Sequence, residues 1–183
     1  ILLSLKSSLF YFRFGFFYIA ICYFLENANN YFKKYIFFLF FLFFLIFFDA
    51  LLQTITGFNI LNQKLIHPSR ASSFFGDELI MGSYIVRMLP IIVSLIYFFE
   101  IKKLINLIPI LWLTSIATVI LSAEKNSLGL IIILSAIYLL FSSFSLKTKI
   151  IALLLTVLLS TVLLSSFPQI KKRIYTQAKQ ISS

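Results

Sequence analysis

Residues 35–52 read Tyr-Ile-Phe-Phe-Leu-Phe-Phe-Leu-Phe-Phe-Leu-Ile-Phe-Phe-Asp-Ala-Leu-Leu and carry a single charge, at Asp49. An α-helix needs about 20 apolar residues to cross the hydrocarbon core of a bilayer. A strand of a membrane barrel would alternate apolar and polar residues, and this stretch does not. A helix also satisfies its own backbone hydrogen bonds in lipid. The stretch therefore predicts a membrane-spanning helix.

Similar apolar stretches lie on both sides of it, separated by short polar or charged breaks. The expected spans are approximately 9–25, 35–52, 77–99, 104–122, 127–144 and 150–167. We therefore predict an all-α fold, a polytopic transmembrane bundle of about six helices that forms a single domain over 1–183. An outward loop over 53–76 joins the second and third spans, and a basic outward tail covers 168–183.

The composition excludes a soluble globular domain. Of the 183 residues, 61% are hydrophobic and 12% are charged, and the mean hydropathy is +1.01. Six acidic and sixteen basic residues cannot cover the surface of a soluble core. The single cysteine and single histidine exclude an internal disulfide and a Cys/His zinc site. The chain begins inside an apolar run without Met, and we interpret it as an internal piece of a longer protein.

The lysines of the short breaks predict an orientation. The breaks on one side carry Lys33, Lys34, Lys102, Lys103, Lys147 and Lys149. The breaks on the other side carry Lys64, Arg70 and Lys125, spread over more residues. The positive-inside rule places the first set in the cytoplasm, so the loop over 53–76 and the tail face outward. The basic residues of the tail then either serve a purpose outside or precede a longer domain.

Charged residues around the third span are candidates for function. Asp77 is placed to cap this helix, and Glu78 lies in its first turn, where the helix dipole favours negative charge. Capping is the simpler interpretation of both. Arg87 lies ten residues after Asp77, about 15 Å along the helix axis. A cation at that depth is costly and faces a cavity or a partner. A structural arginine that joins helices through carbonyl groups explains it equally well.

Three further charges lie on the same outward side. Arg70 has no evident structural role in the loop, and by itself it reads as a solvated cation. Glu124 and Lys125 form a corner after the fourth span, where adjacent opposite charges are usually solvated. These three residues become candidates for function because of the sequence segments that contain them.

The segment 70–84 reads Arg-Ala-Ser-Ser-Phe-Phe-Gly-Asp-Glu-Leu-Ile-Met-Gly-Ser-Tyr and is followed by Arg87. It resembles a passage of the bacterial O-antigen ligase and polymerase family. Residues 47–50 and 57–60 resemble the helix end and loop before that passage. Residues 121–126, Leu-Ser-Ala-Glu-Lys-Asn, resemble the Ser-Gly-Glu-Arg corner of the family. The resemblance covers about 12–125, and its specific part is the loop motif.

The resemblance implies a glycan transferase of the bacterial inner membrane that acts at the periplasmic face. Its donor would be an oligosaccharide linked to polyprenyl pyrophosphate, and its acceptor a lipid A core or a second carrier-linked glycan. Membrane lipids would surround it, without a cofactor, a metal or a nucleic-acid partner. Arginines would hold the pyrophosphate, because guanidinium groups bind phosphate bidentately. A histidine of a later periplasmic loop would assist the attacking hydroxyl.

Arg70 matches the arginine of the motif and is the catalytic candidate. The candidates for binding substrate are Arg87, Lys125, Asp77, Glu78 and Glu124. Lys125 stands where the family has arginine, which replaces a bidentate clamp by a point charge, and Ala123 replaces the corner glycine. His67 lies in a different loop from the catalytic histidine. We therefore expect these 183 residues to lack the catalytic histidine loop and to be inactive alone.

Two other functions stay open. A transporter or flippase for a lipid-linked or anionic substrate would use Arg87, with Pro90 and Pro109 as helix breaks, although the expected internal repeat is not visible. A non-catalytic membrane scaffold is the third possibility. The polar stretch over 70–84 argues against a scaffold, because lipid packing does not require it. The sequence does not distinguish ligase from polymerase and identifies neither sugar nor acceptor.

Overall fold

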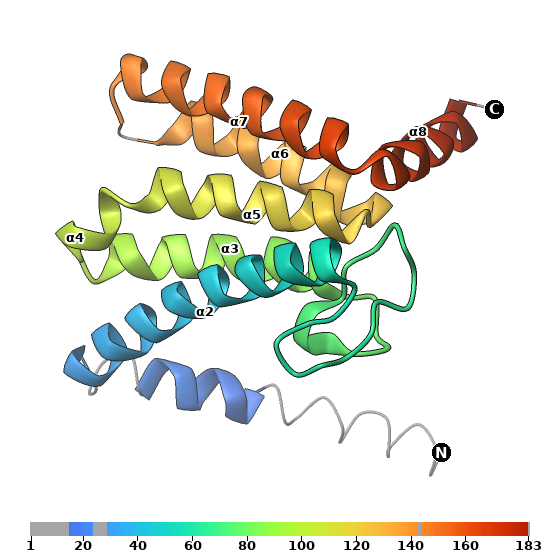
Figure 1. The fold of residues 1–183 in the computed structure, drawn as a ribbon. Helices are drawn as coiled ribbons and strands as arrows, with labels where there is room; N and C mark the ends of the chain where they lie inside the picture. Colours follow the sequence, from blue (N-terminus) through green and yellow to red (C-terminus); the bar gives the residue numbers. More distant parts are fainter. Residues whose placement is uncertain (1–14, 24–28, 143, 183) are drawn as a thin grey trace, which may run out of the picture.

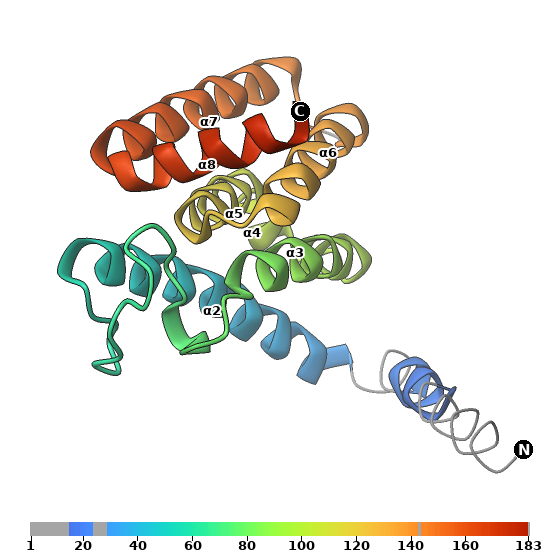
Figure 2. The same ribbon diagram turned by 90° about the vertical axis from the view of Figure 1, so that its right-hand side faces the viewer.

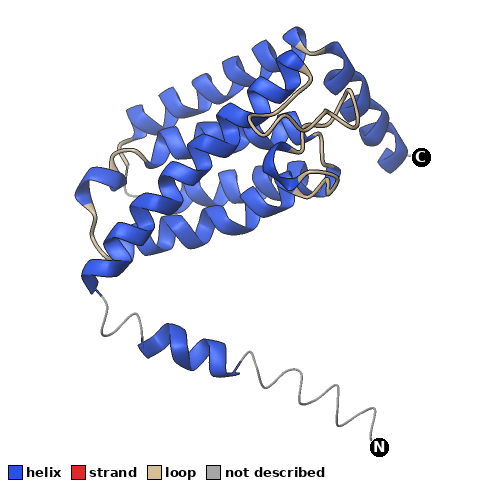
Figure 3. Ribbon diagram, turned by 60° about the horizontal axis from the view of Figure 1, so that its bottom comes forward, coloured by secondary structure: helices blue, strands red, loops and turns tan. Residues whose placement is uncertain are grey.

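The computed structural model describes residues 15–23, 29–142 and 144–182. Within these residues helices are joined by loops, and there is no β-strand (Figure 3). Residues 15–23 form a helix. The elements that follow are α2 (Asn29–Thr56), η1 (Ser73–Phe75), α3 (Met81–Phe98), α4 (Lys102–Ile105), α5 (Ile108–Ser122), α6 (Lys125–Phe141), α7 (Leu146–Ser166) and α8 (Pro168–Ser182). The predicted all-α class is confirmed.

Helix α5 is the centre of the bundle. It packs against α2, α3, α6 and α7, and most of its side chains are buried. Figure 1 shows these five helices side by side, with α5 between the pair α2–α3 and the pair α6–α7. Pro109 lies in the first turn of α5, where its fixed φ and missing N–H suit a helix start. The apolar core therefore forms around one short helix.

Three described helices are long and apolar enough to cross a membrane: Lys33–Thr56 within α2, Met81–Phe98 and Leu146–Ser166. Helices α5 and α6 are also apolar but have only 15 and 17 residues. The outer faces of the bundle carry exposed apolar side chains, such as Phe41 at 62% and Leu154 at 61%. A continuous apolar exterior of this kind indicates contact with a membrane. Three of the six expected spans thus have membrane length in the structure.

Several boundaries differ from the sequence-based expectation. The helix expected over 77–99 begins at Met81, and the helix expected over 104–122 is divided into α4 and α5 by a short break. Within the expected tail, residues Pro168–Ser182 form the helix α8. Part of the first expected span, 9–25, lies outside the described residues.

The two ends of the bundle carry different segments. The loop between α2 and α3, the turn between α5 and α6, and the start of α8 lie at one end, which we call the loop end (Figures 1 and 2). Helix α4 and the turn between α6 and α7 lie at the other end, which we call the lysine end. Figure 2 shows that α8 runs across the loop end rather than continuing the line of α7. The candidate residues Arg70, Glu124 and Lys125 therefore lie at the loop end.

Candidate functional site

Two buried polar side chains of α2 hold the segment that follows the loop arginine. Asp49 accepts hydrogen bonds from the N–H of Ile60 at 2.7 Å and from the hydroxyl of Ser73 at 2.5 Å. Gln53, one turn later, accepts bonds from the N–H groups of Ser72 at 2.9 Å and Ser73 at 2.8 Å. Both side chains are fully buried. Because a buried charged acceptor is costly unless it is paired, these bonds fix the path of the loop.

Arg70 is half-buried and binds two backbone carbonyl groups. Its Nε donates to the oxygen of Ser122 at 3.2 Å, and its Nη2 donates to the oxygen of Leu79 at 2.9 Å. The N–H of Ala71 donates to the oxygen of Leu121 at 3.0 Å. The guanidinium group thus joins the loop to the end of α5 and to the segment before α3. Since arginine has five N–H donors, some remain for a ligand.

Arg173 of α8 and Glu124 lie near Arg70. Burial lowers the pKa of the Arg70 guanidinium, the charge of Arg173 lowers it further, and the charge of Glu124 raises it. Arg70 stays a cation at neutral pH because the ordinary pKa of arginine is far above neutral. The Nε of Arg173 is buried and has no hydrogen-bond partner within the described part of the chain. Two neighbouring guanidinium groups with an unsatisfied donor are a suitable environment for an anion.

Glu124 binds the first turn of α3. Its carboxylate accepts bonds from the N–H of Ser83 at 2.8 Å and from the hydroxyl of the same residue. That hydroxyl also lies 3.3 Å from the hydroxyl of Ser127. The first N–H groups of a helix have no partner inside the helix, and the helix dipole favours an acidic group beside them. Glu124 therefore caps α3 from the turn between α5 and α6.

Gly82 permits this contact. A Cβ atom at this position would overlap the Oγ of Ser122, and it would lie 2.8 Å from the Oε2 of Glu124 and 3.1 Å from the Cβ of Ser127. A side chain at residue 82 would therefore displace the Ser122 and Glu124 side chains from their present positions. Glycine at this position allows the start of α3 to contact residues 122–127 closely.

Asp77 and Glu78 lie outside this cluster. Both are exposed, and α3 begins four residues after Asp77 with Ile80 as an N-cap that makes no side-chain bond. The interpretation of Asp77 as the cap of this helix is wrong, because Glu124 reaches the first turn from another part of the chain. A role of either carboxylate in binding substrate stays a prediction.

An open groove lies beside the cluster, between α3 and α6. Its volume is about 570 Å³, and its lining includes Ser83, Arg87, Lys125 and Asn126. Arg87 is exposed, and among the described residues no hydrogen bond or ion pair reaches its guanidinium group. It lies roughly 9 Å along α3 from the helix start, not the 15 Å expected, because the helix begins later. Ser83 belongs to both the cluster and the groove and connects the two.

The structure brings together Arg70 and Glu124 and places Arg87 and Lys125 in the adjoining groove. It also shows three residues that the sequence does not mark as functional: Asp49, Gln53 and Arg173. Asp49, the single charge of the apolar stretch over 35–52, is fully buried. The sequence feature that could have identified Asp49 is its spacing from Gln53, because the two polar residues lie one helical turn apart at the end of an apolar helix. Arg173 lies between Ile170 and Ile174, which pack on the core, so a helical interpretation of the tail would have placed it near the bundle.

No protein-family model, no curated protein and no solved structure matches this chain. A function must therefore be proposed from the side chains at the loop end.

Proposed function

We propose that this chain is the central membrane part of a glycan transferase of the O-antigen ligase or polymerase type. In this proposal, it binds an oligosaccharide linked to polyprenyl pyrophosphate and passes the glycan to a lipid A core or to a second carrier-linked glycan. The reaction takes place at the periplasmic face of the bacterial inner membrane. The chain crosses this membrane about six times, with α5 and α6 as short spans.

The observation that carries the proposal is the pair of guanidinium groups at the loop end. Arg70 is held by the carbonyl groups of Ser122 and Leu79, so its orientation is set before a ligand binds. Arg173 lies close enough to lower the pKa of Arg70, and its Nε is buried without a partner among the described residues. A pyrophosphate leaving group gains negative charge as its glycosidic bond breaks. Positioned cations stabilise such charge, and they cost little reorganisation when they are already in place.

The groove supports a substrate that is linked to lipid. It opens at the end of the bundle between two apolar helices and carries Arg87 and Lys125 on its walls. A carrier lipid can enter between helices while its pyrophosphate reaches cations near the membrane surface. Lys125 acts as a point charge in this groove rather than as a bidentate clamp.

The distribution of lysines supports the direction of the proposed topology. The lysine end carries Lys102 and Lys103 in α4, which connects α3 to α5, and Lys147 and Lys149 in the first turn of α7, beside its connection to α6. The positive-inside rule places such connections in the cytoplasm. The loop end, with both arginines, then faces the periplasm, where lipid-linked glycans are used.

The decisive experiment is the variant Arg70→Ala in the complete protein, produced in a bacterial host that lacks its own enzyme of this type. We expect surface glycan to fall at least a hundred-fold, because removing one positioned donor costs about that factor in rate. The Lys64→Ala variant is the matched control, since Lys64 is an exposed cation of the same loop. Surface glycan is measured by gel electrophoresis of extracted lipopolysaccharide. Unchanged glycan in Arg70→Ala would remove the catalytic assignment.

A second variant separates bidentate binding from simple charge. Arg70→Lys keeps the positive charge but cannot bind both carbonyl groups and a phosphate together, so we expect it to remain nearly as inactive as Arg70→Ala. Immunoblots of membrane fractions confirm equal amounts of each variant. Full activity of Arg70→Lys would show that only net charge matters at this position.

A further inference from the structure

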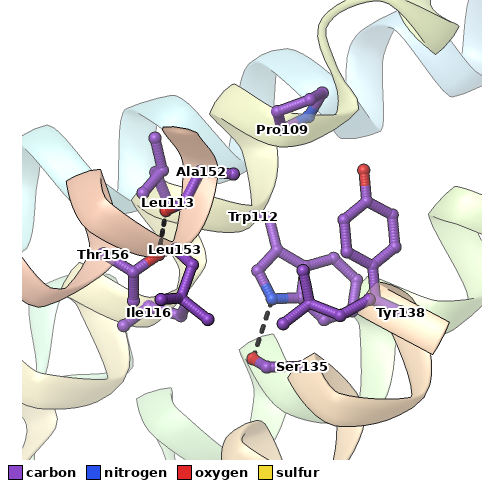
Figure 4. Close-up of a pocket in the computed structure, with 10 residues that line it drawn as sticks. Pro109, Trp112, Leu113, Ile116, Ser135, Tyr138, Ala152, Leu153 and Thr156 are labelled. Atoms are coloured by element: carbon purple, nitrogen blue, oxygen red, sulfur yellow. Dashed lines mark hydrogen bonds between the residues drawn. The ribbon is translucent and has the colours of Figure 1, made fainter. Parts of the chain in front are cut away.

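A small apolar pocket lies between α5, α6 and α7, far from the arginine cluster (Figure 4). Its volume is about 90 Å³. Trp112 comes from the first part of α5, Tyr138 from the last part of α6, and Ala152 and Leu153 from the first half of α7. By these positions the pocket lies toward the lysine end of the bundle.

The Trp112 indole N–H and the Thr156 hydroxyl of the pocket wall form hydrogen bonds within the protein. The indole of Trp112 stacks on Tyr138, with ring centroids 4.3 Å apart and planes inclined by 13°. The indole Nε1 donates to the hydroxyl of Ser135 at 2.9 Å. The hydroxyl of Thr156 donates to the backbone oxygen of Ala152 at 2.7 Å (Figure 4). The face that remains for a ligand is therefore almost entirely apolar.

The pocket is not closed by neighbouring protein on the side where α6 and α7 meet. Helix α7 packs mainly on α5, and α6 packs on α3 and α5, so the two helices make little contact with each other. Leu153, which lines the pocket on this side, is apolar and 48% exposed. Since α7 has membrane length, this side faces the hydrocarbon of a bilayer. The occupant available there is an alkyl chain.

Two features beside the pocket indicate the headgroup of the lipid that supplies this chain. Lys147 and Lys149 lie in the first turn of α7, a few residues before Ala152, and no acidic residue occurs over 142–156. Basic residues next to a span attract anionic lipids. The hydroxyl of Tyr138, a residue of the pocket wall, is buried and has no partner within the described residues, and an ester carbonyl that entered the pocket would supply one.

We propose that this pocket binds one acyl chain of an anionic phospholipid from the leaflet that borders Lys147 and Lys149. The proposal requires the bundle to lie in a bilayer but does not depend on glycan transfer. The lipid fills the gap between α6 and α7 and thereby completes the packing around α5.

Trp112 provides a direct test, because it is the only tryptophan of the chain. The full chain is reconstituted in bilayers that contain phospholipid brominated in the middle of its acyl chains, and bromine quenches indole fluorescence on contact. Brominated phosphatidylglycerol is expected to quench Trp112 at least two-fold more strongly than equally brominated phosphatidylcholine at the same mole fraction. Equal quenching by the two lipids would overturn the choice of an anionic headgroup.

Two sets of variants test the position of the lipid. Ala152→Phe fills the pocket and should abolish the preferential quenching, whereas Ala136→Phe adds the same ring on an exposed position of α6 and should not. The double variant Lys147→Gln/Lys149→Gln leaves the pocket unchanged and should remove the preference for phosphatidylglycerol. If the preference survives both Ala152→Phe and the lysine double variant, the lipid does not bind here.

Discussion

At the scale of single residues, Gly82 sets how closely α3 approaches the turn between α5 and α6. A Cβ atom at this position would overlap the Oγ of Ser122 and would lie only 2.8 Å from the Oε2 of Glu124. Gly82→Ala should therefore push α3 away from this turn and break the cap that Glu124 provides. Overpacking of this kind costs about 1–3 kcal/mol. We expect a lower melting temperature of the purified protein in lipid nanodiscs.

Gly129→Ala is the matched control for this variant. Gly129 also lies within a helix, but a Cβ atom there would have no neighbour within 4 Å. Alanine is favoured over glycine inside a helix by roughly 0.5–1 kcal/mol, so this variant should be as stable as the parent or more so. Equal melting temperatures for the two variants would contradict the proposed contact at Gly82.

Glu124 is the second residue whose substitution tests the cluster. Its carboxylate accepts both the N–H and the hydroxyl of Ser83. Removal leaves the N–H without this acceptor, and the hydroxyl retains only Ser127 as a neighbour. A hydrogen bond to a charged group contributes about 1.5–3 kcal/mol. Glu124→Ala should destabilise the protein by about that amount, and Glu124→Gln by less, because glutamine retains an acceptor oxygen. Thermal unfolding of the two variants measures the order, and an Ala variant as stable as the parent would exclude the cap.

The sequence indicates the importance of these charges but not their partners. The segment over 70–84 marks Arg70 as a candidate, and the structure places this residue in a half-buried cluster. The expected cap of α3 is Asp77, the local acidic residue. The observed cap, Glu124, is 41 residues from Ser83 along the chain. Local spacing can predict only caps that come from the same helix start.

At the scale of elements, the loop between α2 and α3 depends on Asp49. This carboxylate binds the N–H of Ile60 and the hydroxyl of Ser73, two points at opposite ends of the loop. Asp49→Ala should release the loop, because both donors lose their partner and an unpaired buried donor costs about 1–3 kcal/mol. We expect faster trypsin cleavage after Lys64, which is exposed in this loop, followed by mass spectrometry.

Asp77→Asn serves as the control for the released loop. Asp77 lies in the same connection, but it is exposed and caps no helix. Its cleavage rate should equal that of the parent. If Asp49→Ala is cleaved no faster than Asp77→Asn, the loop is held by other contacts.

The apolar runs of the sequence predict where the helices lie, but they do not predict the residues at which the helices begin and end. The run over 35–52 predicts α2 because nothing in it breaks a helix, and the structure extends it to Asn29–Thr56. The division of α4 from α5 does have marks in the sequence, because Asn106 and Pro109 interrupt the apolar run and Pro109 suits the first turn of a new helix. The helical tail is hard to predict because its basic residues resemble a solvated segment. Its apolar positions, Ile170 and Ile174, are spaced by one helical turn.

At the scale of the whole molecule, the two ends of the bundle should lie on opposite sides of the membrane. Single-cysteine variants test this in a Cys22→Ser background: Lys64→Cys at the loop end and Lys147→Cys at the lysine end, both at exposed positions. A membrane-impermeant maleimide should label Lys64→Cys in intact cells. It should label Lys147→Cys only after the membrane is opened. The reverse pattern would invert the proposed topology, and labelling of both in intact cells would exclude it.

The central position of α5 has a consequence for synthesis. The helices α2 and α3 both pack against α5, yet they leave the ribosome before it. Until Ile108–Ser122 has been made, the Ser122 carbonyl group that helps to hold Arg70 does not exist, and the capping carboxylate of α3 is also absent. During synthesis, α2 and α3 are therefore present before α5, the helix against which both pack. Assembly of the arginine cluster becomes a late event of biogenesis, and a pause in translation before α5 should prolong the period in which chaperones and membrane proteases can recognise the chain.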